Sequence, residues 1–179
     1  MIRTLAATLV TLMIMGGLAL PVRADTVDVS GTVTATDTIG SEVSSGVYSF
    51  TGTGSGVDSV YGDFSFSSMG TLDFNNSTAS GTFEEIFADG MLYGTSSATS
   101  SEIGTSTLYN VTVDETITGG TGIFADVTAG ELTIIGTSSS ITGTLNGNYT
   151  GTITTPEPSS LALMLVGIGF LPLMRKRLV

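Results

Sequence analysis

The chain has 179 residues, with 5 Lys and Arg, 16 Asp and Glu, and no His, Cys or Trp. The segment 25–155 holds no Lys or Arg but 15 of the 16 acids, so its formal charge is −15 against −11 for the whole chain. Phosphate contacts need Lys and Arg, so this segment excludes nucleic acid as a partner. It also lacks the His, Lys, Cys and Arg groups that much catalysis uses, and we predict a non-enzymatic protein without a cofactor.

Residues 1–24 have the layout of a secretory signal peptide. Arg3 precedes a mainly apolar run from Leu5 to Leu20, and Val22 and Ala24 are small residues three and one positions before the break. We predict cleavage after Ala24, which makes the protein an exported one. An uncleaved anchor helix or an ordinary core helix is the alternative.

The segment 155–179 contains three ordered parts. These are the tripeptide Pro156, Glu157, Pro158, an apolar stretch over 161–174, and a basic cluster of Arg175, Lys176 and Arg177. The stretch covers ~21 Å as a helix, so a transmembrane helix across a hydrocarbon core of ~30 Å must include neighbouring residues. The basic cluster favours the cytoplasmic side and places the acidic segment outside. A plain tail anchor or a buried helix is the alternative.

This ordered triplet resembles the PEP-CTERM protein-sorting signal of Gram-negative bacteria. The resemblance implies that Pro156, Glu157 and Pro158 are the sorting motif and that an exosortase-type enzyme processes the tail there. It also implies an inner-membrane precursor that is exported to the cell surface or the extracellular space with exopolysaccharide or biofilm material.

The residues between the two ends, 25–154, have the patterning of an all-β domain. Apolar residues alternate with polar ones from Val27 to Ala35, from Tyr109 to Val113, and around Leu132 and Ile134. This period-two pattern is typical of half-buried antiparallel strands, whereas the Ser- and Thr-rich composition leaves disorder as the alternative. Strands are predicted at 27–36, 44–52, 58–67, 71–75, 81–88, 91–98, 105–118, 131–137 and 139–154. We predict a small antiparallel barrel of about eight strands, with a β-sandwich as the alternative, flanked by the signal helix and the transmembrane helix.

Three glycine-containing stretches are predicted to be turns. Asp89-Gly90 suits a tight hairpin. A three-residue loop over 146–148 is predicted to pair Leu145 with Tyr149 on one face. The stretch 52–56 lacks the Lys and the following helix of a phosphate loop, so we predict a flexible hairpin tip.

The stretch 117–131 contains the sequence T-G-G-T-G-I-F-A-D. It is similar to the turn of the allene oxide cyclase and dirigent barrel superfamily, but Ile123 replaces a usually polar residue and 127–129 is one residue longer. The resemblance implies an eight-stranded barrel and carries no reaction with it. The glycines allow a positive-φ connection, and we expect Phe124 to enter the core.

The adjacent acids Glu84-Glu85 and Asp114-Glu115 are the candidate chemical groups. Neighbours on a strand point to opposite faces, so neither pair forms a glycosidase couple by itself, although a couple from different strands stays open. Ca²⁺ held by acidic residues is a second hypothesis, but no EF-hand loop is present and the sequence identifies no metal ligand. Solvated carboxylates that keep the domain soluble are the simpler explanation.

Three functions remain. We predict a non-enzymatic surface or extracellular-matrix protein, associated with polysaccharide and sorted through its C-terminal signal. The alternative is a small-ligand-binding barrel, and an isomerase or carboxylate-based hydrolase is the least favoured. In the second case, five aromatic residues either line the cavity or fill it: Phe64, Phe66, Phe83, Phe87 and Tyr109.

Overall fold

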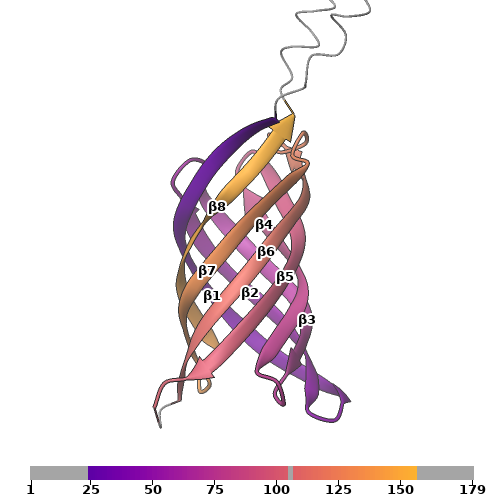
Figure 1. Cartoon of the computed structure of the whole chain (residues 1–179), viewed down its shortest axis with the longest axis vertical. Helices are drawn as coiled ribbons and strands as arrows, with labels where there is room; N and C mark the ends of the chain where they lie inside the picture. Colours follow the sequence, from indigo (N-terminus) through magenta and orange to yellow (C-terminus); the bar gives the residue numbers. More distant parts are fainter. Residues whose placement is uncertain (1–23, 105–106, 157–179) are drawn as a thin grey trace, which may run out of the picture. The chain divides into compact units, whose positions relative to one another are not determined.

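The computed structural model describes residues 24–104 and 107–156. These residues form eight strands: β1 (Ala24–Ser44), β2 (Val47–Asp58), β3 (Gly62–Asp73), β4 (Thr78–Phe87), β5 (Gly90–Glu102), β6 (Leu108–Gly122), β7 (Ala129–Ser139) and β8 (Thr144–Pro156). The strands follow one another in sequence order around a closed antiparallel barrel (Figure 1). The predicted all-β barrel is therefore confirmed, and the sandwich alternative is wrong. The expected signal helix and transmembrane helix lie outside the described residues.

Period-two alternation produces the barrel wall. Val29, Val33 and Ala35 on β1 point inward and are 2–4% exposed, while Ser30, Thr32 and Thr34 between them are exposed. On β7, Leu132 and Ile134 are buried in the same way. The alternating residues singled out in the sequence on β1 and β7 are thus core residues. Closing the sheet leaves no free edge strand, which is how small β proteins without disulfides protect their edges.

Two glycine-rich stretches predicted as turns lie inside strands instead. The stretch 52–56 belongs to β2, where a Cβ on Gly54 would lie 2.1 Å from the carbonyl oxygen of Thr34 on β1. Glycine is needed there for close approach of two backbones, not for a hairpin tip. The stretch 146–148 belongs to β8, so the predicted pairing of Leu145 with Tyr149 is wrong. Tyr149 pairs with Ile134.

The observed turns lie at other residues than the predicted ones. The β7–β8 hairpin closes earlier, over 140–143, where the Ser139 hydroxyl accepts the N–H groups of residues 141 and 142 and Gly143 has a φ of 66°. The β4–β5 hairpin is confirmed, but its two loop residues are Ala88 and Asp89, because Phe87 pairs directly with Gly90. The predicted strands 58–67 and 71–75 are one continuous strand, β3.

The β6–β7 connection agrees only in part with its sequence prediction, because Gly119 and Gly120 pair with β5 inside β6 and only Gly122 has a positive φ. Gly122 has a φ of 62°, and a Cβ there would lie 2.1 Å from the carbonyl oxygen of Asp89. A Cβ on Gly120 would lie 2.5 Å from the Cβ of Phe124. Phe124 is 2% exposed and enters the core as predicted.

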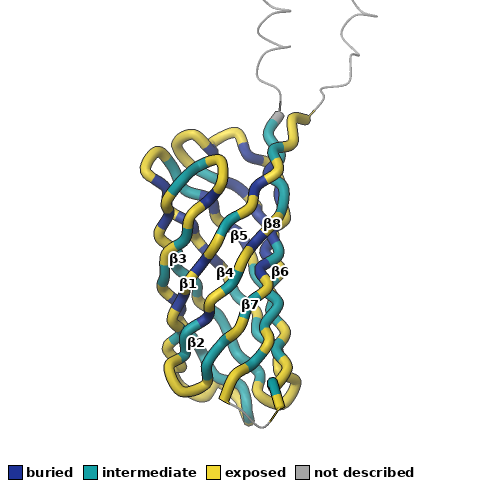
Figure 2. Tube along the Cα trace, turned by 90° about the vertical axis from the view of Figure 1, so that its left-hand side faces the viewer, coloured by how far each residue is buried: buried dark blue, intermediate teal, exposed yellow. Residues whose placement is uncertain are grey.

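The two ends of the barrel differ. One end, which we call the closed end, contains the start of β1, the end of β8 and the β2–β3, β4–β5 and β6–β7 connections (Figure 1). The opposite end, which we call the open end, contains the β1–β2, β3–β4, β5–β6 and β7–β8 connections. Buried residues gather toward the closed end (Figure 2). Tyr61 packs edge-on against Phe124 with ring centroids 4.8 Å apart, and Phe64 and Phe87 lie 5.2 Å apart. Aromatic packing therefore fills the closed half.

Candidate functional site

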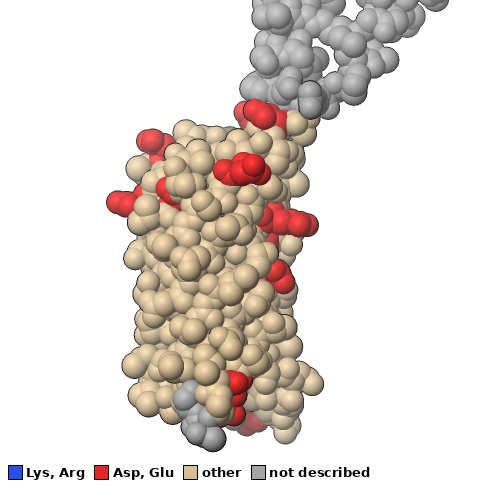
Figure 3. All heavy atoms as spheres, turned by 60° about the vertical axis from the view of Figure 1, so that its left-hand side comes forward, with Lys and Arg blue, Asp and Glu red and all other residues tan. Residues whose placement is uncertain are grey.

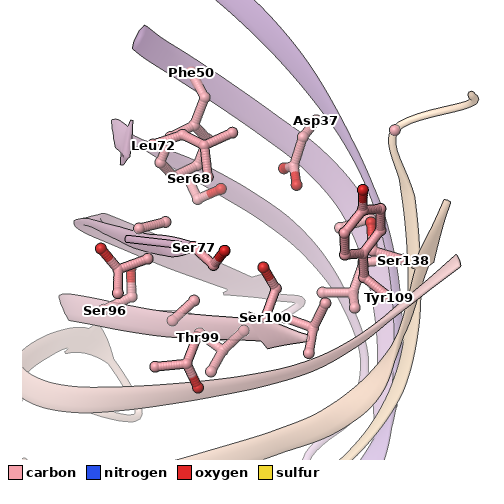
Figure 4. A pocket seen from close by; sticks show the side chains of 18 of the residues that line it. Asp37, Phe50, Ser68, Leu72, Ser77, Ser96, Thr99, Ser100, Tyr109 and Ser138 are labelled. Carbon is pink, nitrogen blue, oxygen red and sulfur yellow. The ribbon is translucent and has the colours of Figure 1, made fainter. Parts of the chain in front are cut away.

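The open half of the barrel contains a cavity of about 440 Å³. All eight strands contribute side chains to its wall, together with residues of the open-end connections such as Phe74 and Gly143. Figure 4 shows side chains from several strands directed into one shared space. The barrel is thus packed at one end and hollow at the other.

The hollow follows from the size of the inward-facing residues. In the closed half, strands β3, β4 and β5 present Phe64, Phe83, Phe87 and Leu92 to the interior. Further along the same strands, several residues that line the cavity are small: Ser68, Ala79, Ser96 and Ala98. Because the strands stay at a nearly fixed spacing, the smaller side chains leave unfilled volume.

The five aromatic residues singled out in the sequence divide between these halves. Phe64, Phe83 and Phe87 belong to the packed core. Phe66 is partly buried against that core and also lines the cavity, and Tyr109 lines the cavity. The two sequence interpretations, filling and lining, therefore each hold for part of the set.

Glu115 lies at the inner end of the cavity. The cavity-lining residues of β6 run inward from Tyr109 through Val111 and Val113 to Glu115. Glu115 is 1% exposed, and neither of its carboxyl oxygens has a hydrogen-bond partner. Burial, with a further contribution from the charge of Glu85, raises the pKa of Glu115 well above its ordinary value. Burial therefore favours the uncharged form of this carboxyl in the empty barrel.

Two further carboxyls are buried inside the barrel. Glu85 on β4 is 3% exposed, and burial, together with the charge of Asp58, raises its pKa to about 8. Asp58, at the end of β2, accepts hydrogen bonds from the N–H groups of Val60 (2.7 Å) and Tyr61 (2.8 Å) and from the hydroxyl of Tyr149. Burial and the hydrogen bond to Asp58 raise the pKa of that hydroxyl. Asp58 is thus anchored by hydrogen bonds, whereas Glu115 is not.

The structure places the two predicted acid pairs as strand geometry requires. Glu84 and Asp114 face outward, and Glu85 and Glu115 face the interior. Sequence reasoning missed that the inward members share one interior with Asp58. The signal was present, because Glu85 alternates in phase with Phe83 and Phe87.

The mouth of the cavity is also acidic. Burial raises the pKa of Asp37, whose carboxyl points into the cavity together with the Ser68 and Ser100 hydroxyls (Figure 4). Asp73 accepts hydrogen bonds from Asn75 N–H (2.9 Å) and Asn76 Nδ2 (2.6 Å), which lower its pKa. Among the described residues, the cavity is therefore lined by three carboxyls and no basic group.

Other features of the described part of the chain add little to this site. Within 24–104 and 107–156, no group of three or more Asp, Glu, His or Cys is arranged to hold a metal ion, so the Ca²⁺ hypothesis finds no site there. No helix among these residues is long and apolar enough to cross a membrane. On the outer face seen in Figure 3, most acids lie in the half toward the closed end, a few lie near the opposite end, and the band between them shows none.

Of the predicted sorting and cleavage residues, only Ala24 and Pro156 are described, as the ends of β1 and β8. Glu157, Pro158 and the basic cluster of 175–177 lie outside the described residues. Comparison with family models, curated proteins and solved structures found no match to this chain.

Proposed function

We propose that this protein is an exported barrel that binds a small, largely apolar ligand in its open half. The observation that carries the proposal is the cavity of about 440 Å³, which lies within the range of roughly 300–1,000 Å³ usual for small-molecule sites. Its wall combines apolar side chains such as Val113, Ile134 and Leu145 with a few fixed polar groups. That combination is the usual composition of a ligand pocket.

The buried acid at the inner end supports a functional reading of the cavity. A buried polar group without a partner costs roughly 1–3 kcal/mol, and protein interiors are normally close-packed. The open half of the barrel contains an unfilled cavity, and the buried Glu115 that lines it has no hydrogen-bond partner among the described residues. The barrel interior is therefore neither close-packed nor fully hydrogen-bonded at this one place. Such coinciding departures are typical of functional sites.

The test is a titration of the barrel, residues 24–156, with the neutral fluorescent probe N-phenyl-1-naphthylamine. Every strand and core residue lies within this range, and circular dichroism with cooperative urea unfolding verifies that each variant is folded. We expect saturable binding of one probe per barrel. Ala98→Phe, which fills the cavity, should abolish it, while Ser97→Phe, on the outer face of the same strand, should not. Absence of saturable binding to the folded barrel, or equal binding by both variants, would overturn the proposal.

We also propose the export route that the two ends indicate. The signal peptide is removed after Ala24, the tail anchors a precursor in the inner membrane, and an exosortase-type enzyme processes the chain at Pro156, Glu157 and Pro158. The barrel then acts at the cell surface or among extracellular polysaccharide. This proposal is supported by the order of the tripeptide, the apolar stretch and the basic cluster 175–177.

Cell fractionation tests this route. Changing Pro156, Glu157 and Pro158 together to alanine should leave an uncleaved, membrane-bound form in the native organism. Changing Ser159 and Ser160 together to alanine is the matched control and should leave processing normal. Normal processing of the triple variant would contradict the sorting proposal.

A further inference from the structure

We propose that the cavity selects a small amphiphilic organic cation, a primary ammonium on an apolar chain, and holds the ammonium group at Glu115. This inference rests on the proposed ligand-binding function and adds the chemical class of the ligand. Three observations carry it: the cavity is acidic, the carboxyl of Glu115 has no hydrogen-bond partner among the described residues, and the cavity opens only at the open end of the barrel.

The charge in the barrel excludes anionic ligands. The segment 25–155 contains 15 acids and no Lys or Arg, and the whole chain has no His. Inside the cavity the ionisable acids are Asp37, Asp73 and Glu115. A ligand carboxylate or phosphate would meet no cation and several acids in a low-dielectric space, where charges interact more strongly than in water. A cation meets carboxyl groups at both ends of the cavity and no like charge among the described lining residues.

The unpartnered carboxyl of Glu115 matches an ammonium group. Both of its oxygens lack a donor, and an ammonium group supplies three N–H donors and a positive charge. Hydrogen bonds between ionised partners are about twice as strong as neutral ones. An alcohol of the same size supplies one neutral donor, and a carboxylate supplies none. The ammonium ligand therefore gains most from reaching the inner end.

The shape of the cavity orients the ligand. Phe66, Val113 and Ile134 line the wall beside Glu115, and Ile39 and Phe74 line it near the open end. Because the closed half is filled by packed aromatic residues, the ligand must enter from the open end. The polar head then lies deepest, and the apolar chain extends toward the mouth.

Binding of a cation should release a proton. Burial favours the uncharged form of Glu115 in the empty barrel, and the groups opposite it on β5 and β7, Ser96 and Leu132, do not titrate. The titratable groups of the acid network on other strands are Glu85, Asp58 and Tyr149, and Asp37 on β1 lines the same cavity. None of them is a cation, so the arriving ammonium is the charge that favours ionised Glu115. Its proton passes to the buffer, and affinity for the cation rises with pH, by at most about tenfold per unit.

The experiment compares ligands that share one chain and differ in head group. Octylammonium, 1-octanol and octanoate, each below its micelle-forming concentration, compete with N-phenyl-1-naphthylamine for the 24–156 barrel at pH 7. We expect octylammonium to bind at least about tenfold more tightly than 1-octanol, and octanoate to bind most weakly. Calorimetry in two buffers of different ionisation enthalpy should show net proton release when octylammonium binds.

Two variants with the same charge change provide the control. Glu115→Gln should remove the preference for octylammonium and the proton release while N-phenyl-1-naphthylamine and 1-octanol still bind. Asp114→Asn, the outward-facing neighbour on the same strand, should keep both effects. If the neutral probe binds but octylammonium does not surpass 1-octanol, the cation inference is overturned and the ligand-binding function stands. An unchanged preference in Glu115→Gln would also overturn it, and failure of every probe to bind would overturn both proposals.

Discussion

Replacing Glu115 with leucine should stabilise the barrel. The wild-type carboxyl is 1% exposed and both oxygens lack partners, beside apolar neighbours that include Val113, Ile117 and Leu132. Removing an unsatisfied buried polar group recovers its desolvation cost, roughly 1–3 kcal/mol. We therefore expect Glu115→Leu to raise the free energy of unfolding by about 1–3 kcal/mol at neutral pH, at the expense of cation binding.

The gain should depend on pH in a defined direction. The folded-state pKa of Glu115 is raised, so between the unfolded pKa near 4.5 and the folded pKa the native barrel holds a proton that the unfolded chain has lost. Wild-type stability is fully present below that window and falls as pH rises through it, by up to about 1.4 kcal/mol per pH unit for one group. Leucine has no such loss, so the advantage of the variant should be larger at pH 8 than at pH 5.

Urea unfolding followed by far-ultraviolet circular dichroism measures this difference, since the chain contains no Trp. The titrations are run at pH 5 and pH 8 at one ionic strength. Glu84→Leu, at an exposed position on β4, is the control and should change stability by no more than about 0.5 kcal/mol. A loss of more than about 1 kcal/mol for Glu115→Leu at pH 8 would refute the reasoning, because it would mean that the carboxyl has stabilising partners.

Three further changes test other parts of the structure. Glu85→Gln should flatten the fall in stability between pH 4.5 and about 8, seen as a smaller difference between urea midpoints across that range; an unchanged slope would contradict the raised pKa. Tyr149→Phe removes a hydroxyl that donates to buried Asp58 and should cost about 1–3 kcal/mol of unfolding free energy, and a change below about 0.5 kcal/mol would be inconsistent with that bond. Gly122→Ala combines a positive φ with a contact of 2.1 Å to the backbone, so it should lower the melting temperature more than Gly62→Ala, where φ is also positive but nothing lies within 4 Å; equal effects would show that the contact relaxes freely.

The local pattern of the sequence was sufficient to predict the all-β class and the inward faces of β1 and β7. The burial of Val29, Val33 and Leu132 could be predicted because side chains alternate between the two faces within each single strand. The glycines of 52–56 were misread because glycine serves both turns and close backbone contacts. Only the approach of the Thr34 carbonyl on a neighbouring strand distinguishes the two.

The cavity and the acid cluster were beyond sequence reasoning for a related reason. The cavity depends on the summed volume of inward side chains from all eight strands, as the small residues Ser96 and Ala98 illustrate. The meeting of Asp58, Glu85 and Glu115 depends on how the strands are staggered, including the irregular pairing at Tyr93 and Gly94. Register between strands is set by turns and packing together, and a single strand does not encode it.

The most direct test of the ligand site is methyl NMR of the 24–156 barrel titrated with N-phenyl-1-naphthylamine. We expect the methyl signals of Val113, Ile134 and Leu145, which line the cavity, to shift together and to saturate at one probe per barrel. Signals of Val127 and Ile153, in the packed core, should stay unchanged. Shifts confined to outward-facing methyls such as those of Ile86 and Ile135, or no saturable shift at all, would contradict the account.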